Sequence, residues 1–287
     1  MESEVAFIGF GEAATAFAVA GAHGYDLKLD DPSTERAKRA DFDAVGVVAC
    51  PTAALAVAQA RVVLSLVTAD QALAAARSAG EHLAPGTLWL DMNSVAPDTK
   101  RAAAAAIAAG ARYVDVAVMA PVDPARRKVP LLVSGPHAEA GAQALASLGF
   151  DTVSIVGTQI GEASAIKMIR SVMVKGIEAL SAECVLAADA AGVRDAVIAS
   201  LDASWPGADW TRRFDYNLDR MMVHGGRRAA EMEEVVKTLD ALGTGSAMSR
   251  GTVERQRAIG DLDLAPPAGL VAKLAALTPP LDQDQAA

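Results

Sequence analysis

The sequence has only two cysteines, Cys50 and Cys184, among its 287 residues, and neither belongs to a C-x-x-C pair. A disulfide framework and a cysteine-based metal site are therefore not expected, and this composition fits a reducing cytoplasm. The four histidines are dispersed and form no H-x-x-x-H spacing. No pattern of residues typical of a metal site is present.

Positive charge and long apolar runs are also scarce. The 26 Lys and Arg residues face 35 Asp and Glu residues, and this net charge of −9 disfavours nucleic acid and anionic membranes as partners. No run approaches the roughly 20 uninterrupted apolar residues of a membrane span, and the acidic start lacks the pattern of a signal peptide. We therefore expect a soluble, cytoplasmic protein that acts on a small molecule.

Aromatic residues make up only 4% of the chain, but hydrophobic residues make up 52%, which is enough for a sizeable core. Short apolar stretches alternate with helical ones through the first half. Apolar strands separated by helices predict a parallel sheet that is covered on both faces. The predicted strands are 5–9, 25–31, 61–67, 87–91, 113–118 and 131–134, and the predicted helices are 13–22, 71–79 and 97–109.

The second half changes character, because the β signal stops near residue 155. A helical pattern then continues over 160–191 without proline, much longer than a typical globular helix. Further helices are predicted over 195–204, 216–241 with a break at Gly225–Gly226, 244–259, and a short segment within 264–287. The fold class is thus α/β, a Rossmann-type doubly wound sheet (1–157) followed by an all-α domain (158–287) joined by a long interdomain helix.

The first predicted strand runs into a G-x-G-x-x-A motif that begins at Gly9. Gly9 permits a tight turn into a helix, Gly11 lets the backbone approach a pyrophosphate, and the N–H groups of the helix face the anion. An ordinary strand-to-helix turn is the alternative, but acidic residues about twenty positions later favour a dinucleotide. The expected cofactor contacts in this loop are Gly9, Phe10, Gly11, Glu12 and Ala13.

Asp30 and Asp31 are predicted to end the second strand. A carboxylate there accepts hydrogen bonds from the adenosine ribose and repels the 2′-phosphate of NADP. The sequence leaves open which aspartate does so, and the alternative role is a helix cap before Pro32. NAD is therefore favoured over NADP, which stays possible. Leu66 and Val67, at the end of a later strand, are expected to contact the cofactor as well.

Three motifs in order resemble the β-hydroxyacid dehydrogenase family, which includes 3-hydroxyisobutyrate and 6-phosphogluconate dehydrogenases. They are FIGFGEAATAFA at the start, DMNSVAP at 91–97 and GEASAIK at 161–167. The segments KMIRSVMVKGIEAL and HGGRRAAEMEEVVKTLDALG look most like the branch whose C-terminal domain was long described as of unknown function. The resemblance covers most of the chain. It implies an NAD(P)-dependent oxidoreductase whose helical domain contributes to substrate binding and forms a homodimer.

In the resembled family the catalytic lysine occupies the position of Lys167. A lysine at a domain junction loses hydration, which would lower its pKa toward the range of a general acid/base, and Arg170 would act in the same direction. On spacing alone, a solvated surface lysine is the simpler interpretation, and the family match favours catalysis. The resemblance implies that Ser94 and Asn93 position substrate or nicotinamide, while Arg170 and Ser171 bind polar groups.

Two departures from the family pattern alter the expected substrate site. The family's K-x-x-N-N is K-M-I-R-S here, so a cation and a hydroxyl replace two amides. The family's D-A-P-V-S-G-G loop aligns with residues 115–121, where small backbone donors give way to methionine, alanine and proline. We expect a larger, partly apolar substrate rather than 3-hydroxyisobutyrate. The expected substrate contacts are Ser94, Met119, Ala120, Pro121, Arg170 and His224.

The predicted reaction is hydride transfer between a nicotinamide cofactor and a hydroxy acid or related alcohol. Lys167 would be the general acid/base, with Ser94, Arg170 and Ser171 as further catalytic residues. One alternative is an imine or aldehyde reductase on the same scaffold, and another is a non-catalytic dinucleotide-binding protein. Lys167 favours alcohol–carbonyl chemistry, because family members that reduce imines usually lack this lysine.

Overall fold

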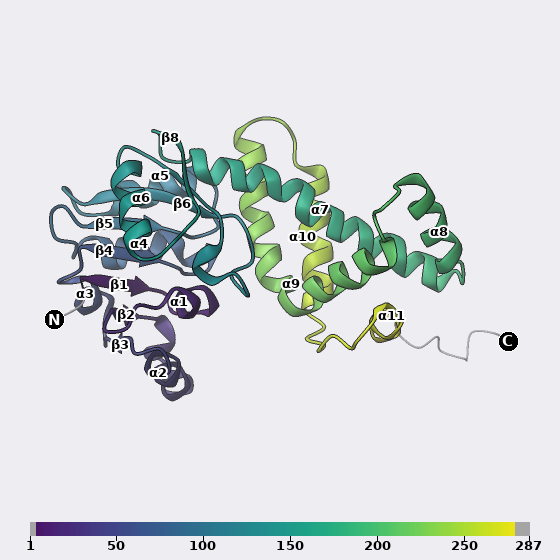
Figure 1. Cartoon of the computed structure of the whole chain (residues 1–287), viewed down its shortest axis with the longest axis horizontal. Helices are drawn as coiled ribbons and strands as arrows, with labels where there is room; N and C mark the ends of the chain where they lie inside the picture. The colour runs from purple at the N-terminus through teal and green to yellow at the C-terminus, as the bar shows by residue number, and fades with distance from the viewer. Residues whose placement is uncertain (1–3, 279–287) are drawn as a thin grey trace. The chain divides into compact units, whose positions relative to one another are not determined.

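The computed structural model describes residues 4–278, and the chain forms two compact units, Met1–Ile169 and Arg170–Ala287 (Figure 1). The boundary expected from the sequence, after residue 157, coincides with the end of strand β8 (Val153–Gly157). The division between the two units instead falls inside helix α7 (Glu162–Ala190), because this helix begins in the first unit and continues through the second.

The first unit is built on an eight-stranded sheet with the strand order β3-β2-β1-β4-β5-β6-β7-β8. Its strands before β8 are β1 (Val5–Ile8), β2 (His23–Tyr25), β3 (Val48–Ala49), β4 (Val62–Ser65), β5 (Leu88–Asp91), β6 (Arg112–Val118) and β7 (Leu131–Ser134). Strands β1 to β6 pair in parallel, which is the arrangement predicted for the sheet. Strands β3 and β8 are not among the predicted strands.

Strand β7 departs from the all-parallel prediction, because it pairs antiparallel with β6. The described connection between them, residues 119–130, contains only the 3-10 turn η3 (Arg126–Lys128). A parallel return would need a longer crossover, usually a helix, so this short connection brings the chain back alongside β6 in the opposite direction.

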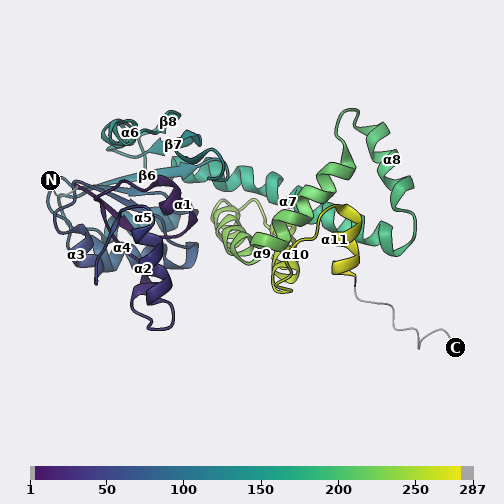
Figure 2. The same ribbon diagram turned by 60° about the horizontal axis from the view of Figure 1, so that its bottom comes forward.

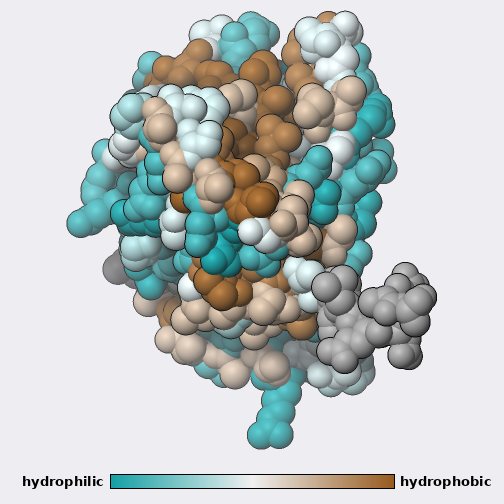
Figure 3. Space-filling model, turned by 90° about the vertical axis from the view of Figure 1, so that its right-hand side faces the viewer, coloured by the Kyte–Doolittle hydropathy of each residue, from teal (hydrophilic) through white to brown (hydrophobic). Residues whose placement is uncertain are grey.

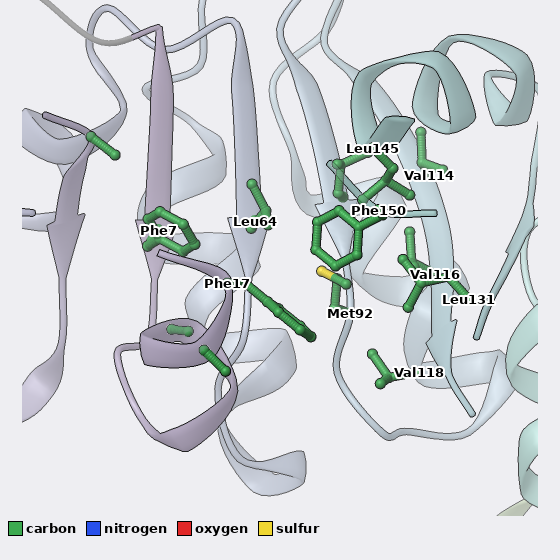
Figure 4. Packing of buried hydrophobic residues seen from close by; sticks show 14 of the residues in the cluster. Phe7, Phe17, Leu64, Met92, Val114, Val116, Val118, Leu131, Leu145 and Phe150 are labelled. Atoms are coloured by element: carbon green, nitrogen blue, oxygen red, sulfur yellow. The ribbon is translucent and has the colours of Figure 1, made fainter. Parts of the chain in front are cut away.

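Helices cover both faces of the sheet (Figure 2). Alternate side chains of β1 and β4, including Phe7 and Leu64, pack with Phe17 and Leu145 on the face covered by α1 and α6 (Figure 4). The intervening side chains pack against α3, α4 and α5 on the other face. The doubly wound α/β class is thereby confirmed. The helices are α1 (Glu12–Phe17), α2 (Glu35–Asp43), α3 (Ala53–Val57), α4 (Ala72–Gly80), α5 (Pro97–Ala106) and α6 (Ala138–Ser147).

Helix α1 is shorter than the predicted helix over 13–22 and ends at Phe17. The guanidinium of Arg127, from the connection after β6, donates to the carbonyl of Phe17 at 3.0 Å and also to that of Ala18. Carbonyls at the end of a helix need such donors. A residue 110 positions away therefore caps this helix, which no local pattern could have indicated.

The second strand also ends earlier than predicted, and the extended structure expected over 25–31 is wrong. Strand β2 ends at Tyr25, and the 3-10 turn η1 (Leu27–Leu29) follows. The carboxylate of Asp26 accepts a hydrogen bond from the backbone N–H of Lys28 at 3.0 Å. Aspartate side chains commonly divert the backbone into a turn in this way.

The second unit is all-helical in its described part, as predicted. Helix α7 is followed by α8 (Arg194–Ser204), α9 (Trp210–Ala241), α10 (Ala247–Gly260) and α11 (Leu270–Leu277). Phe214, Leu218 and Met221 of α9 lie at the centre of its core, with Leu274 of α11. The end of the predicted tail segment, 279–287, lies outside the described residues. Among residues 4–278, no helix is long and apolar enough to cross a membrane.

The break predicted at Gly225–Gly226 is wrong, because α9 runs through both residues. A Cβ atom on Gly225 would lie 2.4 Å from the carbonyl oxygen of Gln256 and 2.6 Å from the Cα of Gly260. Glycine at this position therefore serves the close approach of α9 and α10. It does not mark the end of a helix.

We expect Gly225→Ala to lower the free energy of unfolding by about 1–3 kcal/mol, the usual cost of forcing extra atoms into a packed contact. Urea denaturation would measure it. The matched control is Gly226→Ala, because a Cβ there meets nothing within 4 Å. Alanine is the better helix former, so this control should leave stability unchanged or raise it by up to about 1 kcal/mol. Equal losses in both variants would contradict the close-contact role.

Candidate active site

The strand order reverses between β1 and β4, because the chain builds β2 and β3 on one side of β1 and returns to build β4 on the other. Open parallel sheets bind ligands at this switch point, beside the carboxyl ends of the strands. Gly9 follows β1 with φ +84°, and a Cβ on it would lie 2.6 Å from the carbonyl oxygen of Leu66 and 2.7 Å from Val67. Only glycine allows the two loops to meet so closely.

Two hydrogen bonds to the backbone of Phe10 hold the loop between Gly9 and α1. The N–H of Phe10 donates to the Asp26 carboxylate at 2.7 Å, and its carbonyl accepts from the Lys38 ammonium at 2.8 Å. Its ring is fully buried and stacks on Phe42 with 3.9 Å between ring centroids. Phe10 thus anchors the loop. Gly11 has no atom within 4 Å of a built Cβ, so its backbone lies open to a ligand.

Glu12 and Ala13 form the first turn of α1, directly after Gly11. The N–H groups at the start of a helix have no partner within the helix and suit an anion such as a pyrophosphate. With the open backbone at Gly11, the residues present therefore fit the phosphates of a dinucleotide.

Three carboxylates follow β2, and the nearest of them was missed by the sequence reasoning. Asp26 comes directly after the strand and is half-buried. Asp30 accepts from the Tyr25 hydroxyl at 2.5 Å, and burial together with Asp30 raises the pKa of Tyr25 to about 12. Asp31 accepts from the hydroxyl and N–H of Ser33, and these bonds lower the pKa of Asp31. The sequence signal for Asp26 would be the end of β2 at Tyr25, because Asp26 is the first residue after that strand.

The loop after β5 joins the loop after β4 through Asn93. The N–H of Val67 donates to its side-chain oxygen at 2.7 Å, and its amide nitrogen donates to the Ser65 hydroxyl at 2.9 Å. Next in sequence, the hydroxyl oxygen of Ser94 is buried and has no hydrogen-bond partner within residues 4–278. A buried polar atom without a partner is uncommon, and a bound ligand is one way to satisfy it.

The remaining predicted residues lie on three other segments. Met119, Ala120 and Pro121 follow β6 directly, and the N–H of Met119 donates to the Pro130 carbonyl at 2.9 Å. Lys167 is half-buried on α7 in the first unit. The other three belong to the second unit, where Arg170 is exposed, Ser171 is buried and His224 is half-buried on α9.

Comparison with known families agrees with this arrangement. The model described as the NAD binding domain of 6-phosphogluconate dehydrogenase matches residues 4–149, about half of the chain. The chain belongs to the β-hydroxyacid dehydrogenase family. A second model, described as a domain of unknown function (DUF1932), matches residues 188–259 in the helical unit. This is the branch that the sequence motifs indicate.

Two solved structures are similar over nearly the whole chain. A conserved hypothetical protein from Sinorhizobium meliloti 1021 is 40% identical, with a TM-score of 0.72, and the match covers 96% of each chain. The conserved protein MTH1747, described as of unknown function and structurally similar to 3-hydroxyacid dehydrogenases, is 30% identical with a TM-score of 0.65. That match covers 92% of this chain and 99% of MTH1747.

More distant matches share the fold. The 3-hydroxyisobutyrate dehydrogenase of Mycobacterium tuberculosis is 15% identical with a TM-score of 0.71, over 96% of this chain and 99% of its own. Imine reductases have the fold too. Among curated proteins, an uncharacterized 28.5 kDa protein of Methanothermus fervidus is 27% identical over 176 residues. That match spans 61% of this chain and 66% of the relative.

Proposed function

We propose that this family member is an NAD(P)-dependent oxidoreductase that interconverts a hydroxy acid, or a related alcohol, and its carbonyl form. The observation that carries the proposal is the joint presence of a glycine loop at the switch point and Lys167 at the family's lysine position on α7. When bound, the nicotinamide accepts or supplies the hydride, which is the chemistry that side chains cannot perform.

In this proposal the chain's own residues bind, orient and move a proton. Gly11 and the first turn of α1 hold the pyrophosphate, and the unpartnered Ser94 hydroxyl binds the nicotinamide or the substrate. The Lys167 ammonium returns a proton to the carbonyl oxygen, or its neutral amine takes one from the hydroxyl. Asn93 acts on the cofactor indirectly, because its amide holds the loop of Val67 in place.

The proposed substrate is larger and more apolar than 3-hydroxyisobutyrate. Met119 and Ala120 offer apolar, adaptable surface, and Pro121 has no N–H to donate to a carboxylate. Arg170 is exposed three residues after Lys167 on the same helix, and its guanidinium presents a fork of donors that matches a carboxylate. We assign the anionic group of the substrate to Arg170, with Ser171 and His224 as further polar contacts.

A cofactor-linked screen tests this function. The purified protein is incubated with NAD or NADP and with aliphatic, branched and aryl-substituted hydroxy acids, while absorbance at the reduced-nicotinamide band is followed. Turnover with a bulky hydroxy acid above that with 3-hydroxyisobutyrate is the expected result. Turnover only with imines in the reductive direction would support the reductase alternative. Cofactor binding without any turnover would support a non-catalytic role.

NAD is the proposed cofactor, because three carboxylates follow β2 and Asp26 stands directly at its end. We expect Asp26→Asn to weaken NAD binding by about 1–2 kcal/mol, the scale of one charge-assisted hydrogen bond, and to improve NADP binding. Asparagine keeps one acceptor, which serves the Phe10 N–H and so preserves the anchor of the glycine loop, while the hydrogen bond from the Lys28 N–H is lost. Fluorescence titration would measure both affinities, with Asp30→Asn and Asp31→Asn in parallel. Unchanged affinities in all three would show that no carboxylate here reaches the ribose.

We also propose that residues 158–287 form the substrate and dimerisation domain and that the partner is a second copy of the chain. Within the helical unit, α7 is amphipathic, but charged residues lie on its buried side and apolar residues on its outer side. Its buried side includes Lys175 and Glu178, which are both 5% exposed and pair with α9: Lys175 with Glu231 at 2.6 Å, and Glu178 with Arg228.

The outer side of the same helix is apolar. Met173, Ile177 and Leu180 recur at helical spacing and are 64%, 37% and 54% exposed. Figure 3 shows that hydrophobic residues also gather on the end of the helical unit that carries α8 and α11. Large exposed apolar areas mark protein–protein contacts. An identical outer face on a second copy is apolar in the same way, which suits a self-complementary interface.

We expect Met173→Glu to weaken this dimer by at least tenfold in Kd, because the interface would bury an unpaired carboxylate. Light scattering coupled to size-exclusion chromatography, over a range of concentrations, would measure the molar mass. The matched control is Leu55→Glu on α3 of the first unit, which is 56% exposed and belongs to neither of these apolar faces. A wild-type protein that is monomeric at every concentration would contradict the proposal.

A further inference from the structure

Four buried polar residues form a row across the sheet. The strand registers pair Ser65 with Asp91, Asp91 with Asp115, and Asp115 with Ser134, so these residues lie side by side on β4, β5, β6 and β7. All four are completely buried. Polar groups in such a position require partners. This row finds them within itself, on the neighbouring Tyr113 of β6, and on the helices and loops beyond the sheet.

One end of the row holds the first turn of α7. A single carboxylate oxygen of Asp115 accepts from the N–H groups of Gly161 and Ser164, each at 3.1 Å. The hydroxyl of Ser134 accepts from the N–H of Ala163 at 3.0 Å and donates to Asp115. Three backbone donors at the start of α7 are thus satisfied by two strand residues, which serve as a cap supplied by the sheet.

The charge of Asp115 is balanced from within the same cluster. The Lys100 ammonium, on α5, lies 3.3 Å from Asp115 and 3.0 Å from Asp91. Tyr113 donates to Asp91 at 2.6 Å, and burial together with the Asp91 charge holds the pKa of Tyr113 well above its usual range. The phenol therefore stays protonated and continues to donate. The start of α7, whose dipole favours negative charge, completes the balance.

Lys167 lies one helical turn beyond this cap, four residues after Ala163 and three after Ser164. In an α-helix the backbone N–H of a residue donates to the carbonyl four positions earlier. The N–H of Lys167 therefore depends on the carbonyl of Ala163, which belongs to the capped turn. A helix start without its cap frays by about a turn, and this turn includes the carbonyl of Ala163 that accepts from the Lys167 N–H.

We propose that Asp115 and Ser134 are positioning residues for Lys167: they fix the first turn of α7 and thereby set where the lysine ammonium lies. The effect on turnover rests on the proposed function, whereas the effect on the lysine itself does not. Neither residue is assigned any contact with substrate or cofactor.

The test compares Ser134→Ala and Asp115→Ala, each of which removes an acceptor for the start of α7, with the wild-type protein in its full-length form. Lysines are methylated reductively with ¹³C-formaldehyde, and the Lys167 signal in the ¹H–¹³C spectrum is assigned by its absence in Lys167→Arg. Its chemical shift is compared among the proteins at one fixed pH. Turnover and NAD affinity are measured on the unmethylated proteins. Ser147→Ala, which removes an exposed hydroxyl on α6, is the matched control.

In both variants the Lys167 signal should move toward that of solvent-exposed lysines. The value of kcat should fall at least tenfold while the Kd for NAD stays unchanged. If Asp115→Ala does not fold, Ser134→Ala alone decides. A Lys167 signal that stays in place, with only a lowered melting temperature, would overturn the proposal. A moved signal in a protein without dehydrogenase activity would support the positioning role and reject the proposed function.

Discussion

Replacing Lys167 with alanine is expected to lower kcat by about a hundredfold or more while the affinity for NAD stays nearly unchanged. Loss of a positioned general acid/base typically costs a factor of 10² to 10⁴, because the proton must then come from or go to water. The affinity is spared because the glycine loop after β1 and the loop after β4 are held by their own contacts, without this lysine.

Steady-state formation of reduced nicotinamide, with the best substrate from the screen, would measure the loss of turnover in Lys167→Ala. Lys237→Ala is the matched control, because the side chain of Lys237 is 64% exposed on α9 and pairs with Glu234. The control should keep wild-type turnover. A kcat within a few-fold of wild type in Lys167→Ala would show that another group transfers the proton.

Replacing Lys100 with methionine is expected to lower the free energy of unfolding by about 3–5 kcal/mol, the cost of breaking a buried ion pair on one side. The Lys100 side chain is completely buried. Its ammonium lies 3.0 Å from Asp91 and 3.3 Å from Asp115, and it donates to the Asp91 carbonyl at 2.5 Å. Methionine would fill most of the volume but leave two carboxylates in the interior without their cation.

Urea denaturation followed by circular dichroism would measure the loss in Lys100→Met. Lys128→Met is the control, because Lys128 is exposed in η3, and its stability should stay within about 0.5 kcal/mol of wild type. Adding Asp115→Asn to Lys100→Met should restore part of the loss, because one of the two unpaired charges is then removed. A small loss in Lys100→Met would show that the cluster is neutralised in another way.

Much of the first unit could be predicted from local pattern alone. The segments Leu131–Ser134 and Leu88–Asp91 are short apolar runs bounded by turn residues, and both are strands. The long helix was expected over 160–191 and runs from Glu162 to Ala190, because thirty residues of helical spacing without proline leave few alternatives. The glycine motif also falls where expected, after β1 and before α1.

Other features could not be predicted, because their causes are distant in sequence. The end of α1 at Phe17 depends on Arg127, and the continuity of α9 through Gly225 depends on contact with Gly260. A glycine inside a helical pattern looks like a break until the neighbouring helix is known. The spacing from the glycine motif predicts Asp30 and Asp31 as site residues, whereas β2 ends just before Asp26.

Most strands, the glycine loop and the long helix that carries Lys167 follow from local sequence pattern, because each depends on residues that are neighbours in the chain. The strands and α-helices absent from the prediction are β3, β8, α2, α3 and α6. That Asp91, Asp115 and Ser134 lie in one row beside Lys100 depends on the folded chain. Strand register is a pairing between segments far apart, and it is set by the packing of the whole sheet. No single segment contains the information that a carboxylate on β6 caps a helix beginning 46 residues later.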